Sequence, residues 1–351
     1  MNKYKNFRAF NGRVSILIDR KAAFVIICLL IAASAVFVVS TGLGELKIDP
    51  ITVIKVLFGA GSDMETLIVT SFRLPRIIIA LLVGISLAVA GGILQGMIRN
   101  PLASPDVLGI TGGAAAAVVG FLDLFSDKNH SLTVDLAWLP LAAFIGAGVV
   151  AFLVYFLAWK NGVSPIRLVL IGIGISALMH AFTTLLMVMG PIYQASQANI
   201  WITGTVYGSN WKNVGILAPW AAIFLLIAFI AARVINIQEL GSEIATGLGG
   251  KVQKQRFVLL MISTALIGGA VAFAGGIGFV GLMAPHMAKR LVGSSFGALL
   301  PASALLGGIL VMLADLIGRT IFSPLEVPAG VFTAGIGAPY FIYLLFKLRT
   351  S

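Results

Sequence analysis

Long apolar runs, separated by short polar stretches, extend along most of the chain. A helix that crosses a bilayer needs about 20 mostly apolar residues in succession. Ten segments approach or exceed this length, and the weakest, 278–293, is short and contains Pro285 and His286. We therefore predict ten transmembrane helices, with a broken or re-entrant path for 275–298. The predicted helices cover about 22–41, 76–98, 107–124, 136–158, 166–188, 214–233, 256–275, 278–293, 299–318 and 328–346.

A weak repeat relates the two halves of this apolar pattern. A shift of about 184 positions aligns the Ala-Gly-Gly-Ile run at 90–93 with the identical run at 274–277, and Pro101 with Pro285. An odd number of predicted crossings separates the second helix from the seventh, so the two units have opposite orientations in the membrane. Inverted repeats of this kind are typical of transporters built from two related halves.

The composition indicates an integral membrane protein. Of the 351 residues, 59% are hydrophobic and 11% are charged, whereas a soluble domain is roughly half apolar and about one quarter charged. The 40 glycines favour close approach of helices in lipid. The second predicted helix carries a small residue at every fourth position, which places them on one face suited to tight packing. These residues are Gly84, Ala88, Gly92 and Gly96.

The basic residues predict the orientation, because cytoplasmic loops of membrane proteins carry an excess of lysine and arginine. The net charge of +11 follows from this rule, and we do not expect nucleic acid as a partner. Four basic residues lie between Lys3 and Arg13, so 1–21 is predicted to be a cytoplasmic tail before a single permease domain, 22–351. Ten crossings return the C-terminus to the cytoplasm. Three arginines fall on the outer side instead: Arg73, Arg76 and Arg319.

Several motifs occur in a fixed order along the chain. RLPR at 73–76 begins the second predicted helix, and NPLASPDVLG at 100–109 follows it. AFAGGIGFVGLMAPHMAKRL at 272–291, LADLIGR at 313–319 and EVPAGVFTAGIGAPYFIYLL at 326–345 come later. With these motifs, the chain from about residue 22 to its end resembles the permease subunits of ABC importers for iron-siderophores and cobalamin.

This resemblance implies an all-α, ten-helix permease of the cobalamin-permease type, which dimerises around a central pathway. The second subunit is another copy or a paralogue, and an iron-siderophore system favours the heterodimer. The resemblance also implies ABC ATPase subunits on the cytoplasmic side and an extracytoplasmic substrate-binding protein or lipoprotein opposite them. The expected location is the lipid of a bacterial plasma membrane.

The three outward arginines are the first candidate site. Members of the family use arginines at the positions matching Arg73, Arg76 and Arg319 to hold acidic residues of the binding protein. Guanidinium groups suit this role because they bind carboxylates with defined geometry. Alternatively, Arg73 and Arg76 anchor a helix end at lipid headgroups. Asp315 lies four residues before Arg319 and is positioned to neutralise it.

The mostly polar segment 234–255 is the second candidate. Part of it resembles the coupling segment of the family, two short helices that sit in a groove of the ATPase. Glycines in this stretch supply turns between short helices. The alternative is an ordinary solvated connector. The residues that match the coupling segment are Leu240, Gly241, Glu243, Ala245 and Gly247.

The turn after the second helix is the third candidate. Pro101 lacks an amide hydrogen and restricts Asn100 to extended conformations, so the turn is stiff. In the family, residues matching Asn100 and Leu102 help to close the pathway on the cytoplasmic side. The region around Ser164 resembles a second gate. The alternative is that this turn only separates two helices.

The fifth predicted helix is the fourth candidate, because Ser176, His180, Thr183 and Thr184 lie at helical spacing on one face. The resemblance places this helix at the translocation pathway. Polar groups in a membrane are costly unless they face protein or water. His180 either contacts substrate or titrates, or it simply bonds to a neighbouring helix. The three histidines and one cysteine are dispersed, so we predict no metal site, and iron would cross inside a chelate.

The chain lacks a phosphate-binding G-x-x-x-x-G-K-[ST] motif, and Gly249-Gly250-Lys251-Val252 has neither the spacing nor the hydroxyl. We therefore predict no cofactor and no enzymatic activity in this chain, with ATP-Mg bound by a partner ATPase. The predicted function is ATP-driven import of ferric siderophores. Alternatives are cobalamin or haem import by the same fold, or an ion-coupled secondary transporter. The last would require intramembrane carboxylates, and the predicted helix interiors hold almost none.

Overall fold

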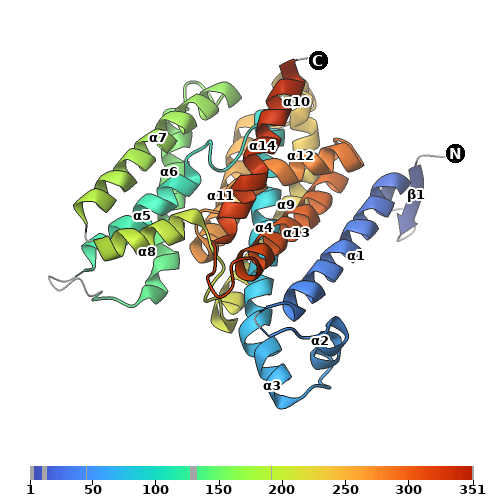
Figure 1. Ribbon diagram of the computed structural model, residues 1–351. Coiled ribbons are helices and arrows are strands. Elements are labelled where there is room, and N and C mark those ends of the chain that lie inside the picture. The colour runs from blue at the N-terminus through green and yellow to red at the C-terminus, as the bar shows by residue number, and fades with distance from the viewer. Residues whose placement is uncertain (1–3, 10–13, 45, 127–132, 191, 350–351) are drawn as a thin grey trace.

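The computed structural model describes residues 4–9, 14–44, 46–126, 133–190 and 192–349 as a helical bundle with one short β-hairpin (Figure 1). The predicted all-α membrane fold is confirmed. The elements are β1 (Tyr4–Ala9), β2 (Val14–Asp19), α1 (Arg20–Gly42), α2 (Pro50–Leu57), α3 (Asp63–Thr66), a π-helix (Leu67–Arg73), α4 (Leu74–Ile98), α5 (Ile110–Leu124), a 3₁₀-helix (Leu136–Trp138), α6 (Leu139–Leu157), α7 (Pro165–Met189), α8 (Ile192–Thr203), α9 (Trp211–Glu239), α10 (Ser242–Gly247), α11 (Val252–Ala274), α12 (Val280–Val292), α13 (Phe296–Thr320) and α14 (Ala329–Arg349).

All ten predicted helices are present, and eight helical segments of the described chain are long and apolar enough to cross a membrane. The other two predicted helices, α5 with 15 residues and α12 with 13, are about 22 and 20 Å long at 1.5 Å per residue. A hydrocarbon core is about 30 Å thick. α5 and α12 are therefore each too short to cross that core alone, and a non-helical segment, 275–279, precedes α12 within the predicted broken path 275–298.

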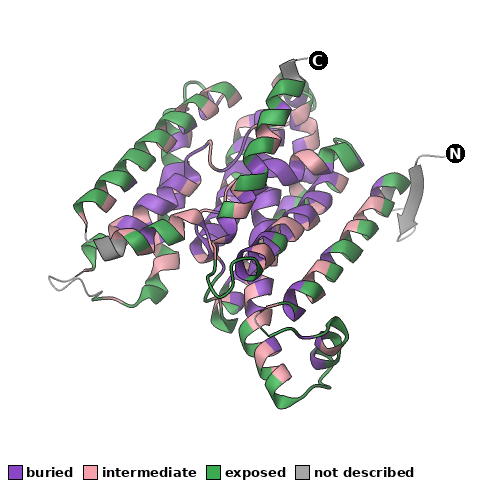
Figure 2. Ribbon diagram, viewed as in Figure 1, coloured by how far each residue is buried: buried purple, intermediate pink, exposed green. Residues whose placement is uncertain are grey.

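The helices α4 and α11 form the centre of the bundle. α4 packs against α11 and α13, and most of α4 and α11 is buried inside the protein. By contrast, few residues of α1, α7 and α9 are buried, and Figure 2 shows α1 and α7 mainly in the colours of exposed and intermediate residues. Both termini lie toward the end of the bundle that carries α10, and α2 and α3 lie at the opposite end (Figure 1). We call these the α10 end and the α2–α3 end.

Glycines permit the close packing of α4. A Cβ atom on Gly84 would lie 2.2 Å from the carbonyl oxygen of Gly307 in α13, and one on Gly91 would lie 1.8 Å from that of Gly281 in α12. Backbones approach this closely only where side chains are absent. The predicted small-residue face of α4 is therefore a packing surface.

A bulky residue at this surface is expected to destabilise the bundle. Gly84→Val would force α4 and α13 apart, and overpacking of this kind costs about 1–3 kcal/mol. The melting temperature of the purified protein in detergent should fall accordingly. Gly148→Val in α6 is the matched control, because no atom lies within 4 Å of a Cβ built there. Equal melting temperatures for the two variants would contradict this packing role.

The polar regions contain structure that the apolar pattern did not predict. The predicted N-terminal tail forms the antiparallel pair β1–β2, and α8 lies in the predicted gap 189–213. The prediction overlooked Asn11-Gly12 between the two strands, a dipeptide typical of hairpins. The second predicted helix is also longer, because α3 and the π-helix continue into α4 from Asp63.

The repeated Ala-Gly-Gly-Ile run has a different structure in each half. In the first half, 90–93 lies in the middle of α4, whereas in the second half α11 ends at Ala274. Gly275 adopts a φ of +65°, and the Trp201 carbonyl oxygen lies only 2.0 Å from where its Cβ would be. The same motif thus continues a helix in one half and ends one in the other, because its tertiary neighbours differ.

Candidate functional site

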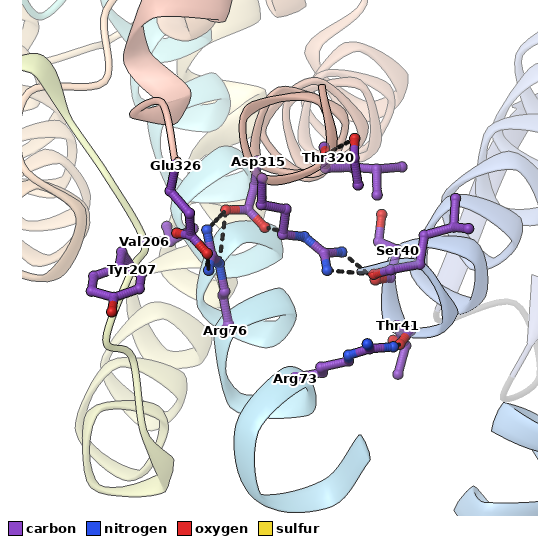
Figure 3. Close-up of polar contacts among 12 residues, drawn as sticks. Ser40, Thr41, Arg73, Arg76, Val206, Tyr207, Asp315, Thr320 and Glu326 are labelled. Atoms are coloured by element: carbon purple, nitrogen blue, oxygen red, sulfur yellow. Dashed lines mark hydrogen bonds and ion pairs between the residues drawn. The ribbon is translucent and has the colours of Figure 1, made fainter. Parts of the chain in front are cut away.

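At the α2–α3 end, Arg76 joins three elements of the chain. Its Nε donates to Asp315 Oδ1 at 2.9 Å, and its Nη1 donates to Glu326 Oε1 at 3.0 Å. Asp315 lies in α13, and Glu326 lies in the segment between α13 and α14. Figure 3 shows the guanidinium group of Arg76 between these two carboxylates, and the ring of Tyr207 lies 5.6 Å from it.

The other two arginines contact the C-terminal end of α1. Arg319 pairs through Nε with Asp315 Oδ2 at 3.4 Å and donates to the carbonyl oxygens of Ser40 and Leu43. Arg73 donates to the carbonyl oxygens of Thr41 and Gly42 at 3.0 and 2.8 Å. Helix C-termini leave carbonyl groups without partners, so these arginines cap α1 and connect it to α4 and α13.

The three arginines also line one cavity of about 300 Å³. Glu326 is the single acidic residue among the described residues that line it. The cavity is therefore electropositive. Arg319 is 8% exposed and the Arg76 side chain 15% exposed, so both guanidinium groups face inward.

At the α10 end, the predicted coupling residues lie around α10. Leu240 ends α9, and Gly241 precedes α10 with a φ of +114°. Ala245 is buried against the bundle, whereas Leu240, Ile244 and Leu248 are exposed. These three apolar side chains are therefore available to a partner at this end. Glu243 is exposed in the first turn of α10, and Gly247 is its last residue.

The predicted gate residues form tight local structure near the same end. The Leu102 amide donates to Asn100 Oδ1 at 2.9 Å, which closes the turn around Pro101. Ser164 caps α7 by accepting the Arg167 amide at 3.3 Å. These contacts stiffen both segments, and a gating role for them stays a prediction.

A second cavity, of about 390 Å³, lies where the non-helical segments before α5 and before α12 meet. Ser104 and Asp106, before α5, line one side, and Gly276, Gly278 and Phe279, before α12, line another. Broken helices occur in membranes where they line a cavity. The segments before α5 and before α12 thus converge on one cavity, although more than 150 residues separate them in the sequence.

This cavity has apolar walls and a small polar group. Asp106 accepts hydrogen bonds from Thr111 Oγ1 at 2.9 Å and from the Phe279 amide. His180 of α7 also lines the cavity. Ser176 Oγ donates to the Asp106 carbonyl oxygen at 3.2 Å, which fixes α7 to the segment before α5.

Comparison with known proteins identifies the family. Residues 29–347 match the FecCD transport family. The chain belongs to that family.

The relatives of this FecCD-family chain are named as transport permeases. It is 61% identical over 333 residues, 95% of this chain and 97% of the relative, to the "Probable siderophore transport system permease protein YfhA" of Bacillus subtilis. It is 47% identical over 320 residues, 91% of this chain and 90% of the relative, to the achromobactin transport system permease protein CbrC of Dickeya dadantii.

A solved structure agrees with these relatives. With a TM-score of 0.80 and 29% identity, the chain resembles a protein described as a metal-chelate type ABC transporter in an inward-facing conformation. The match covers 93% of this chain and 99% of the other. The expectation of a FecCD-type permease fold is confirmed.

The structure separates the predicted pathway residues of this FecCD-family chain into two groups. His180 lines the cavity of about 390 Å³, which we call the central cavity, and Ser176 bonds to the backbone of Asp106 in its wall. Thr183 and Thr184 instead donate to carbonyl oxygens one turn earlier in α7, at 2.7 and 2.9 Å. A hydroxyl bonded in this way is satisfied within its own helix.

Of the polar residues that line the cavity, Ser104, Asp106 and Thr111 were not among the predicted site residues. Asp106 was placed in a turn outside the helices, and its neighbours on α12 and α7 are distant in sequence. A useful signal was its position in NPLASPDVLG, between a proline and the start of a helix. Among the described residues, no group of three or more His, Cys, Asp or Glu side chains is arranged to hold a metal ion.

One implication of the resemblance needs correction. The coupling segment was expected to contain two short helices, but the structure has one, α10. Gly249 and Gly250 then lead directly to α11, which begins at Val252. The φ of +82° at Gly249 supplies the turn.

Proposed function

We propose that this chain is the permease subunit of an ATP-driven importer for ferric siderophores. The observation that carries this proposal is the FecCD-family match over residues 29–347, together with the siderophore permease named at 61% identity. The placement of the candidate sites supports it. The arginines lie at one end of the bundle and the α10 segment lies at the other (Figure 1).

ABC ATPase subunits are expected to bind the α10 end, and they rather than this chain would hold ATP-Mg. The exposed side chains of Leu240, Ile244 and Leu248 offer an apolar surface for such a partner, since exposed apolar patches mark interaction sites. The permease itself performs no chemistry in this account. It provides two conformations, and ATP binding by the partner shifts the balance between them.

A substrate-binding protein or lipoprotein is expected to dock at the α2–α3 end. The electropositive cavity there fits an acidic side chain of the partner. Arg76 and Arg319 already bond to Asp315, so docking would add to this network rather than use free arginines. With ATPases at the α10 end, where both termini lie (Figure 1), we expect cytoplasmic N- and C-termini in a bacterial plasma membrane.

Removing the acidic group of this cavity should strengthen docking. Glu326→Gln makes the cavity more positive, so we expect several-fold tighter binding at low salt, with the gain lost at high salt. Titration of the purified binding protein onto the permease–ATPase complex in nanodiscs would measure this. Asp63→Asn, an exposed charge change at the same end, is the control. An equal gain in that control, or weaker binding by Glu326→Gln, would count against docking at this cavity.

A second permease subunit is expected to complete the pathway. The central cavity of about 390 Å³ is at the small end of the range for ligand pockets. His180 reaches it from α7, whose outer face is largely exposed. A second copy or, as we favour for a siderophore system, a paralogue would cover that face and enlarge the path.

The rival functions share the fold but differ in energy source or cargo. Asp106 is a carboxylate in a cavity, the kind of residue that an ion-coupled secondary transporter uses, but the family match favours an ABC importer. Reconstituted vesicles with the partner ATPase and binding protein would decide the energy source. We expect uptake of labelled ferric siderophore to require ATP and to stop with vanadate. Uptake driven by an ion gradient without ATP would favour the secondary transporter.

A further inference from the structure

Arg256, near the start of α11, contacts both the α10 segment and the segment that leads into α7. Its Nη2 donates to Ser242 Oγ, in the first residue of α10, at 2.8 Å. Its Nη1 donates to the carbonyl oxygen of Val163 at 2.7 Å. Arg256 is buried, with 6% of its surface exposed, so this guanidinium group is a bridge inside the protein.

The segment on the far side of the bridge is bonded both to α11 and to the first turn of α7. The Val163 amide donates to Gln253 Oε1 at 2.9 Å, so both backbone groups of Val163 bond to α11. Arg167, in the first turn of α7, donates to the carbonyl oxygens of Lys160 and Gly162 at 3.1 and 3.0 Å. The segment 160–164 therefore moves with the start of α7.

The contacts continue along α7 to the central cavity. Ser176 bonds to the backbone of Asp106, and His180 lines the cavity. A rigid helix transmits displacement along its length, so a shift at Val163 is felt at these residues. A continuous set of contacts thus connects α10 to the cavity, and Arg256 is where it crosses between segments.

The hydrogen bonds of Arg256 suit a contact that breaks and re-forms more than a permanent one. A buried charge normally pairs with an opposite charge, but within the described part of the chain Arg256 forms no ion pair with a carboxylate. Its partners are a hydroxyl and a carbonyl, and its Nε has no hydrogen-bond partner there. Arg99 also repels it electrostatically. Bonds to neutral groups exchange at lower cost than a buried ion pair.

We propose that Arg256 is the positioning residue that transmits movement of the ATPase-contacting α10 to α7 and the pathway. This inference rests on the proposed function, because it takes α10 as the contact with the ATPase. Arg256 touches neither ATP nor substrate. Its role predicts a change in the coupling between hydrolysis and transport rather than in hydrolysis itself.

The test measures, for each variant, the amount of labelled ferric siderophore transported per ATP hydrolysed in reconstituted vesicles. Arg256→Gln should keep hydrolysis and lower this ratio roughly 10-fold, the scale of a typical coupling energy. Arg256→Lys should be intermediate, because one ammonium group cannot hold both partners in the fixed geometry of a guanidinium fork. Ser242→Ala should lower the ratio by itself. Arg233→Gln, an exposed basic residue of α9, is the control and should match wild type.

The double variant Arg256→Gln/Ser242→Ala separates this role from general damage. If the two residues act through one bond, the double variant should be no worse than Arg256→Gln alone. Additive losses, or a wild-type ratio in Arg256→Gln, would overturn the proposal. If Arg256→Gln does not fold, Ser242→Ala decides, because it removes only a hydroxyl group, and a wild-type ratio there overturns it. Absence of ATP-dependent transport in the wild-type complex would instead refute the proposed function.

Discussion

Replacing Asp315 with asparagine is expected to destabilise the permease by about 3–5 kcal/mol, the usual cost of removing one partner of a buried ion pair. Asp315 is 3% exposed and bonds to both Arg76 and Arg319. Asparagine keeps the size of the side chain but leaves two poorly solvated cations with one acidic partner fewer. Thermal unfolding of the purified protein in detergent would measure the loss.

Glu326→Gln is the matched control for this prediction. Glu326 bonds to the same Arg76 but is 36% exposed, and exposed ion pairs contribute only about 0–1 kcal/mol. Its melting temperature should stay near that of wild type. A double variant, Arg76→Gln/Asp315→Asn, should lose less than the sum of the single variants because the two side chains interact. Equal losses for Asp315→Asn and Glu326→Gln would contradict a central role of Asp315 at this end.

The second large effect is expected at Gly241. Its φ of +114° is accessible to glycine but strained for other residues, and a Cβ there would lie 3.4 Å from Arg99 Nη1. Gly241→Leu should therefore shift α10 relative to α9 and α4. We expect ATP hydrolysis by the complex to continue while transport falls by roughly 10-fold or more, as expected when a coupling energy is lost.

Gly293→Leu controls for the strain alone. Gly293 has a φ of +84° with no atom within 4 Å of its Cβ position, and it lies after α12, outside 234–255. Both variants carry a comparable conformational cost, so only Gly241→Leu should separate hydrolysis from transport. Hydrolysis and uptake are measured together in the same vesicles. Normal coupled transport by Gly241→Leu would remove this segment from the coupling role.

The sequence predicted the features that depend on local pattern. Runs of apolar residues located the ten helices. The motifs then identified the arginines Arg73, Arg76 and Arg319 as one candidate site and Leu240 to Gly247 as another. The structure places these two groups at opposite ends of the bundle, as the predicted orientation requires (Figure 1).

Features that depend on distant contacts were not predictable in this way. Asp106 belongs to a cavity only because 275–279 folds against it, and the sequence alone gave no reason to bring these segments together. Arg256 begins the predicted helix 256–275, and its burial was not predictable because it depends on the position of the distant Val163. The arginines at the α2–α3 end were expected to face a partner. Asp315 and the end of α1 supply internal partners that their spacing did not reveal.

The central claim is that this chain carries ferric siderophores, and uptake in cells tests it most directly. The cells would lack this gene and the permeases of other siderophore systems but keep the partner subunits of this chain, and would receive radiolabelled iron on a hydroxamate, a catecholate or citrate, with labelled cobalamin alongside. We predict that restoring this gene returns uptake of one iron chelate and leaves cobalamin uptake unchanged. Restoration of cobalamin uptake alone, or of no iron chelate, would contradict the account.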